Sequence, residues 1–145
     1  MQTMIDTETT SRLRFATMRL VRLLRQHADP ETGLSQSLIS ALASIHRAGP
    51  VTLGRLAELE RVQPPSMTRI VAQLEERGLV ARDVDPTDRR VARVRLLPPA
   101  EQMLAELRTR KNEYLAARMA ELAPAELSAI EAALPALEHL AAVSR

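Results

Sequence analysis

The sequence predicts a mainly α-helical fold that carries one small β-hairpin. Apolar residues recur at helical spacing along most of the 145 residues. Between residues 80 and 96 the pattern changes to two short alternating runs, which the turn-forming residues DPTD join. A short helix, a tight turn and a second helix come directly before this hairpin. The order of these elements predicts a winged helix-turn-helix with further helices on both sides.

Two helices are expected ahead of this module. Residues 1–10 are expected to form a flexible tail, and the first helix covers about residues 11–27. The segment DPETG at residues 29–33 then interrupts the pattern with proline and glycine. The second helix covers about residues 35–47 and stops before Gly49, which is suited to closing a helix.

The central module has its own start and stop signals. Thr52 is a suitable N-cap for a short helix. The next helix is expected at residues 64–77, with Gly78 after it as the closing residue. The two strands of the hairpin follow at residues 80–84 and 91–96.

Two more helices are expected after the hairpin. Pro98 opens a long helix to about Leu122, and Pro124 opens the last one, because proline is favoured at the first helical position. The expected organisation is therefore a tail at 1–10, supporting and dimerisation helices at 11–48, a DNA-binding domain at 49–97 and dimerisation helices at 98–145. The terminal helices have more apolar positions than the central module can cover, which favours a homodimer. An intramolecular bundle in a monomer is the alternative.

Composition restricts the class of protein more than its charge does. The net charge is +2 and the sequence pI is about 9.9, and all basic residues except Lys111 are arginines. Little therefore titrates between neutrality and pH 10, so the high pI is weak support for nucleic acid binding. No apolar run reaches the roughly 18 residues of a membrane span, and the N-terminus is polar, which indicates a cytoplasmic protein without a membrane partner.

The residues that carry cofactor or catalytic chemistry are sparse. Cysteine is absent, and the three histidines, His27, His46 and His139, have no partner at metal-ligand spacing. Each histidine is interpreted as a helix-surface or interface residue. No phosphate-binding glycine loop or nucleophile elbow occurs. We therefore expect no cofactor, no metal and no enzymatic activity.

The helix at 64–77 has one apolar and one polar face when it is projected at about 100° per residue. The apolar face consists of Met67, Ile70, Val71 and Leu74, and the opposite face includes Pro65, Ser66, Thr68, Arg69 and Gln73. Arginine can bond guanine and glutamine can bond adenine in the major groove, whereas serine and threonine can reach phosphates. A proline can contact a thymine methyl group. The polar face is thus a candidate DNA-reading surface, with an ordinary solvated helix face as the alternative.

The hairpin presents arginines on its outer face and at its tip. Arg93 and Arg95 alternate with apolar neighbours, so they are expected to be exposed, and Arg89 and Arg90 lie at the tip. A guanidinium on a projecting loop suits the negative potential of a narrow minor groove. An acid at Asp88 is unfavourable beside DNA unless it orients a neighbouring arginine, which is the role we predict for it. A solvated charged turn is the alternative.

With these residues in place, the chain resembles the MarR family of bacterial transcriptional regulators. The segments TLGRLAE, PSMTRIVAQLEERGLVARD and DPTDRRVARVRL carry the resemblance, and it extends over the flanking helices. It implies a homodimeric winged-helix protein that binds a pseudo-palindromic operator, usually as a repressor. It also implies release from DNA when a small aromatic or phenolic effector binds. The family's DNA contacts fall on Ser66, Thr68, Arg69 and Arg90, with Asp88 as the supporting acid.

The chain departs from the family pattern at four places. Pro64 and Pro65 replace residues that keep their amides, so the helix offers fewer N–H groups to a phosphate. Ala72 replaces a common acid, and Leu97 and Ala100 replace the usual threonine and glycine. These departures affect the expected contact pattern rather than the fold.

Two other functions remain open at this point. One is a helical ligand- or protein-interaction dimer that keeps the fold without operator recognition. The other is an architectural DNA binder that responds to no ligand. A scarcity of aromatic residues, one Phe and one Tyr, argues against single-strand binding by base stacking.

Overall fold

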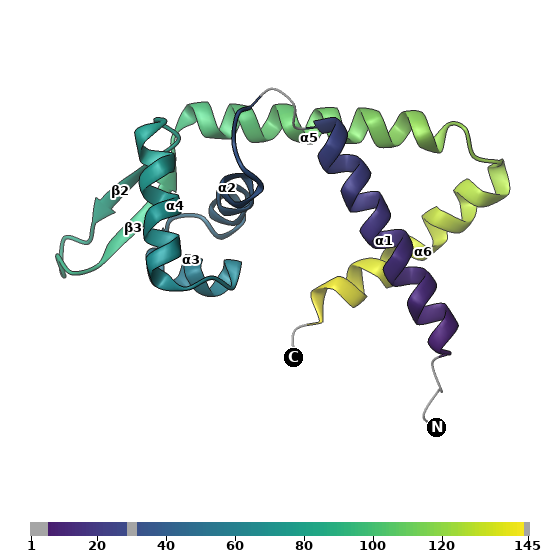
Figure 1. The fold of residues 1–145 in the computed structure, drawn as a ribbon, viewed down its shortest axis with the longest axis horizontal. Coiled ribbons are helices and arrows are strands. Elements are labelled where there is room, and N and C mark those ends of the chain that lie inside the picture. The colour runs from purple at the N-terminus through teal and green to yellow at the C-terminus, as the bar shows by residue number, and fades with distance from the viewer. Residues whose placement is uncertain (1–5, 29–31, 144–145) are drawn as a thin grey trace. The chain divides into compact units, whose positions relative to one another are not determined.

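The protein forms two compact units in the computed structural model, which describes residues 6–28 and 32–143 (Figure 1). One unit covers Ala28–Thr109, and the other combines Met1–His27 with Arg110–Arg145. The helix α5, Pro98–Met119, runs from the first of these into the second. None of the helices in the described ranges is both long and apolar enough to cross a membrane.

The unit Ala28–Thr109 contains the helix-turn-helix and the hairpin. Its elements before α5 are α2 (Gln36–Ala48), β1 (Val51–Thr52), α3 (Leu53–Glu60), α4 (Pro64–Glu76), β2 (Val80–Val84) and β3 (Ala92–Leu96). The Thr52 side chain accepts a hydrogen bond from the Arg55 N–H at 3.2 Å, which confirms its predicted role as an N-cap. Ser35 caps α2 in the same way through the Leu38 N–H.

The hairpin belongs to a sheet of three antiparallel strands in the order β1-β3-β2. The sequence predicted β2 and β3 but not β1, in which Val51 pairs with Val94. A strand of two residues has no alternation to detect, and only the fold brings Val51 to the free edge of β3. Thr52 is both the last residue of β1 and the N-cap of α3. The sheet is therefore joined directly to the first helix of the helix-turn-helix.

A single core of buried apolar residues holds this unit together. Its most fully buried large side chains are Leu42, Ile45, Leu56, Met67, Val71, Leu74 and Val94. The predicted apolar face of α4 is therefore confirmed, although Ile70 is only partly buried. Because α2 and the start of α5 contribute to this core, the compact unit is larger than the predicted segment 49–97.

The other unit contains α1 (Thr7–Ala28), the second part of α5 and α6 (Pro124–Ala142). The helix α1 begins four residues before the predicted start at residue 11. The Asp6 carboxylate accepts a hydrogen bond from the Glu8 N–H at 3.1 Å, and the Asp6 carbonyl accepts one from the Thr10 N–H. Residues 7–10 are thus helical rather than part of a tail, and residues 1–5 lie outside the described part of the chain.

Candidate DNA-binding surface

The N-terminus of α4 offers no free backbone amide in its first turn. Pro64 and Pro65 have no N–H, and Ser66 donates its N–H to the Gln63 carbonyl at 2.9 Å. The Met67 N–H bonds to the same carbonyl at 3.1 Å. A helix N-terminus commonly binds a phosphate through such amides, so an anion here must be bound by side chains.

The predicted reading face of α4 is exposed along its whole length. Its members are Pro65, Ser66, Thr68, Arg69 and Gln73, all of which are exposed. The Arg69 guanidinium has no hydrogen-bond or ion-pair partner among the described residues, so its donors are available to a ligand. The Thr68 hydroxyl, in contrast, donates to the Pro64 carbonyl at 3.1 Å. Thr68 must give up this bond before it can donate to a phosphate.

At the tip of the hairpin, Asp88 holds Arg90 in place. The Arg90 Nε donates to Asp88 Oδ1 at 3.0 Å and its Nη2 donates to Oδ2 at 3.1 Å. The Arg90 backbone N–H also bonds Oδ1 at 3.0 Å. These hydrogen bonds lower the pKa of Asp88 and raise that of Arg90. The structure contains the contact that the predicted role of Asp88 requires, and the Arg90 side chain remains 90% exposed.

The turn that precedes this ion pair is fixed by Asp85. Its carboxylate accepts hydrogen bonds from the N–H and the hydroxyl of Thr87 at 2.8 and 2.6 Å, which lowers the pKa of Asp85. The Asp85 N–H bonds the Val91 carbonyl at 2.8 Å and closes the loop. The tip is therefore a short ordered turn.

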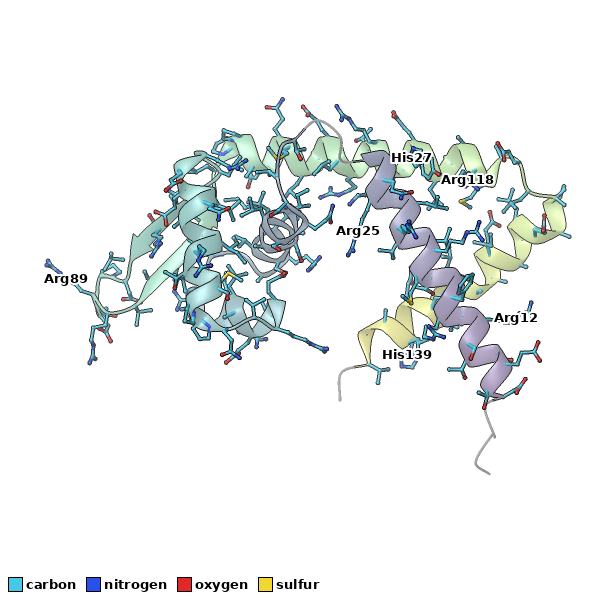
Figure 2. The ribbon with its side chains drawn as sticks, in the orientation of Figure 1. Arg12, Arg25, His27, Arg89, Arg118 and His139 are labelled. Carbon is cyan, nitrogen blue, oxygen red and sulfur yellow. The ribbon has the colours of Figure 1, made fainter. Side chains whose placement is uncertain are left out.

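The other arginines of the hairpin differ in how they are paired. Arg95 bonds Asp83 at 2.6 Å across the two strands, whereas Arg89 has no such partner in the described ranges. Figure 2 shows Arg89 at the far end of the hairpin, with its side chain directed away from the sheet. Arg93 and Arg95 are both exposed, as predicted from the alternation. At the tip, Arg89 is thus exposed, and the Arg90 side chain is more exposed (90%) than those of Arg95 (44%) and Arg82 (34%).

An ion pair joins the hairpin to the reading helix. Arg82 on β2 donates through Nε to the carboxylate of Glu75 on α4, and both side chains are only about one third exposed (34% and 35%). The pair constrains the position of the hairpin relative to α4. Sequence reasoning missed it, because neither residue stands out in a local pattern.

A polar network behind the helix-turn-helix was also not predicted. Glu60, the last residue of α3, accepts hydrogen bonds from the hydroxyls of Ser40 (2.6 Å) and Ser44 on α2. Arg47 donates to the Ser44 hydroxyl at 3.0 Å. Ser40 and Ser44 are four residues apart and so lie on one helix face, which is the only sequence signal that pointed to this contact.

Two of the three histidines, His27 and His46, contact neighbouring side chains. His27 stacks on Tyr114 with ring centroids 4.3 Å apart, and the Arg118 guanidinium lies 5.9 Å from the same tyrosine ring. His46 is 3.4 Å from Arg108. Within the described ranges, no group of three or more potential metal ligands occurs.

Comparisons with known proteins identify the family. The family model described as the MarR family matches residues 34–92. An uncharacterised HTH-type transcriptional regulator of Mycobacterium bovis is 38% identical over 128 residues, which cover 88% of this chain and 89% of that protein. The chain belongs to the MarR family. It is thus a MarR-family helix-turn-helix transcriptional regulator, and its relatives are named as transcription regulators rather than as enzymes.

Solved structures of MarR-family and related regulators confirm the fold class. A transcriptional regulator protein of Pseudomonas aeruginosa superimposes with a TM-score of 0.83 and 31% identity, over 94% of this chain and 96% of that one. A Staphylococcus aureus MepR variant, solved bound to an oligodeoxyribonucleotide, has a TM-score of 0.70 and 15% identity over 90% of this chain and 96% of that chain. The prediction of a mainly helical winged helix-turn-helix is therefore confirmed.

Proposed function

We propose that this MarR-family regulator binds a pseudo-palindromic operator as a homodimer and represses transcription. The observation that carries the proposal is the pairing of two exposed features on one unit. The reading face of α4 presents Arg69, whose donors have no partner in the part of the chain that the structure describes, and the hairpin tip presents Arg90 bound to Asp88. The DNA-bound MepR variant, which shares the fold, supports the same use of this module.

In the proposed complex, α4 enters the major groove and the hairpin reaches the adjacent minor groove. Arg69 bonds guanine and Gln73 bonds adenine, whereas Ser66 and Thr68 contact phosphates and Pro65 contacts a thymine methyl group. Arg89 and Arg90 bind in the minor groove, and Asp88 orients Arg90 there. Two such units, related by a two-fold axis, read successive major grooves about 34 Å apart, on a palindrome of roughly 16–20 base pairs.

The exposed surfaces of α1 and α6 support the homodimer. On α1, Phe15 and Met18 are 64% and 61% exposed in a groove of about 920 Å³. Four arginines border this groove: Arg14, Arg19, Arg22 and Arg25. Exposed apolar side chains that lie together on one helix are the kind of surface that a second helix can cover.

The helix α6 has the complementary character. None of its residues is buried, and its apolar stripe consists of Leu127, Ile130, Leu134 and Leu137. On a helical projection, Glu131 and Glu138 fall beside this stripe, and α6 contains no lysine or arginine. An acid-bordered apolar helix of a second copy fits the arginine-bordered groove of α1, both in apolar surface and in charge.

A gel-shift experiment tests the DNA-binding part of the proposal. The probes are the region upstream of the protein's own gene and a random-sequence duplex of the same length. The proposal expects a shift of the upstream region at much lower protein concentration, and reduced transcription from that region in a purified system. No shift with either probe indicates the interaction dimer, and equal shifts indicate the architectural binder.

The effector and the location complete the proposal. Family membership supports release of the operator by a small aromatic or phenolic ligand. The proposed location is the cytoplasm, because a bacterial operator lies in that compartment. A ligand-library thermal-shift screen, followed by the gel shift, tests the effector. A ligand that raises the melting temperature and also releases the operator supports it. Ligands that bind without releasing DNA contradict it.

A further inference from the structure

Helix α3 ends on an arginine in the left-handed conformation. Arg61 has φ 54° and ψ 42°. Its N–H bonds the Glu58 carbonyl at 3.1 Å, and the Val62 N–H bonds the Ala57 carbonyl at 3.0 Å. This pair of hydrogen bonds is the Schellman motif, in which glycine usually occupies the left-handed position.

The same motif closes α4, but with the usual residue. The Gly78 N–H bonds the Glu75 carbonyl at 2.9 Å, the Leu79 N–H bonds the Leu74 carbonyl at 3.0 Å, and Gly78 has φ 68°. Within the described ranges, Arg61 is the one non-glycine residue with a positive φ. Glycine has a lower conformational energy than arginine in this turn, because a Cβ atom is sterically unfavourable in the left-handed conformation. An arginine here is therefore explained by its side chain rather than by the turn.

The Arg61 side chain is available to a partner. It is exposed and makes no hydrogen bond or ion pair with any residue that the structure describes. The acid beside it in the chain, Glu60, is bound by the hydroxyls of Ser40 and Ser44 instead. Among the described residues, therefore, no acid pairs with Arg61 in the turn between α3 and α4.

Arg61 lies close in sequence to the N-terminus of α4, where the backbone has no free amide to bind a phosphate. Arg61 comes three residues before Pro64, and the first turn of α4 offers no free amide to a phosphate. In an ordinary helix-turn-helix, helix N-termini and nearby side chains fix the protein's position on the DNA backbone. A guanidinium can bond a phosphate through two donors, so it can replace the missing amide contact.

We propose that Arg61 binds a DNA backbone phosphate beside the N-terminus of α4 and there replaces the amide anchor that Pro64 and Pro65 remove. This inference rests on the proposed function, because it assumes that α4 enters a groove of DNA. It adds a positioning contact in the turn between α3 and α4, outside the reading face and the hairpin tip. Because a phosphate contact carries no base information, Arg61 adds affinity for any duplex rather than specificity.

The test is Arg61→Gly, a substitution that suits the turn. Glycine tolerates the left-handed conformation, so the thermal stability of the variant should equal or exceed that of the wild type. Affinity for both the upstream region and the random duplex should fall about tenfold for each Arg61 engaged, the loss expected for one charged hydrogen bond. The plot of log K against log salt concentration should become shallower by about 0.9 for each Arg61 engaged.

Two further variants make the result decisive. Lys111→Ala removes the same charge from α5 in the other unit and should leave the salt slope unchanged. Arg61→Lys keeps the charge and should keep the wild-type slope. The inference is overturned if Arg61→Gly binds both duplexes with wild-type affinity and slope, or if Lys111→Ala matches its losses. If the wild-type protein binds neither duplex, the proposed function fails, and this inference fails with it.

Discussion

The carboxylate of Asp88 binds the guanidinium of Arg90 through two hydrogen bonds, 3.0 Å from Nε to Oδ1 and 3.1 Å from Nη2 to Oδ2. The two residues lie next to each other at a hairpin tip that the Asp85 turn closes. A bidentate pair limits the rotamers of a long side chain that would otherwise be free in solvent. In the proposed complex, an acid on this loop is consistent with DNA binding, provided that the order it imposes on Arg90 outweighs the repulsion between its charge and the DNA.

Replacing Asp88 tests whether that order matters. Asp88→Asn removes a negative charge, which by itself favours DNA binding, but it also removes the charged pair that fixes Arg90. We expect affinity for the operator region to fall several-fold, measured by fluorescence anisotropy. Asp83→Asn is the matched control, because it removes the same charge next to Arg95 and keeps the hydrogen bonds between Asp88 and Arg90. A rise in affinity for Asp88→Asn shows instead that the acid only repels DNA.

The contribution of the Asp88–Arg90 pair to the stability of the folded state should decrease as the pH falls. The pKa of Asp88 lies below 3.8, chiefly because the Arg90 side chain donates hydrogen bonds to it. A lowered folded pKa means that the pair stabilises the folded state above pH 3.8 and that this contribution is lost as the pH falls through the lower value. In Arg90→Ala the titration midpoint of the Asp88 carboxyl carbon, followed by NMR, should move up toward 3.8. An unchanged midpoint means that the pair does not persist in solution.

Arg69 should carry sequence specificity. In Arg69→Ala the free energy of operator binding should become less favourable by about 1–3 kcal/mol for each half-site, because the variant loses hydrogen bonds to a base edge. Affinity for random duplex should change much less. Isothermal titration with both duplexes measures the difference. Equal losses on the two show that Arg69 only touches phosphate.

Arg90 should act through the minor groove. The negative potential of this groove is strongest where A·T-rich sequence narrows it, so Arg90→Ala should lose most affinity on operators with A·T-rich flanks. Gel shifts on operators that differ only in the flanks measure this. Arg89→Ala is the comparison, since Arg89 also lies at the tip. If flank dependence follows Arg89 instead, the inserted arginine is Arg89, and no flank dependence in either variant contradicts minor-groove binding.

The apolar stripe of α6 should hold the two copies together. Leu134→Glu places a charge in that stripe, and Leu134 packs into no core within the described chain (45% exposed). The helix-turn-helix unit should therefore keep its fold by circular dichroism, whereas analytical ultracentrifugation should show monomers and operator binding should be lost. Ser128→Glu adds the same charge on the opposite side of α6 and should remain dimeric. A dimeric Leu134→Glu protein contradicts this interface.

Features that depend on neighbouring residues were predictable from the sequence. Thr52 caps α3 because its hydroxyl reaches an amide three residues away, and Asp88 reaches Arg90 two residues away. The exposed face of α4 followed from helical geometry, and so did its buried face with Met67 and Val71. For such contacts the local backbone conformation is sufficient to bring the groups together.

Contacts between distant segments were not predictable in this way. The Val51–Val94 pairing creates the third strand, Arg82 joins the hairpin to Glu75, and Glu60 binds serines on α2. Each depends on how separate elements pack, which no local pattern encodes. The same limit applied to domain bounds, because α2 shares a core with α4 although it precedes the predicted DNA-binding segment.

The sequence by itself determined the order of elements, the exposed face of α4 and the Asp88–Arg90 pair, because hydrophobic periodicity and short-range hydrogen bonds specify them. Its motifs carry the resemblance to the MarR family, which the comparisons then showed. Only the tertiary structure decided which charges are left unpaired. It showed that Ser40 and Ser44 bind Glu60, and that Arg61, in a left-handed turn, has no hydrogen-bond or ion-pair partner among the described residues. The physical reason is that an arginine's availability depends on every acid that the fold brings near it, and most of those acids are far away in the chain.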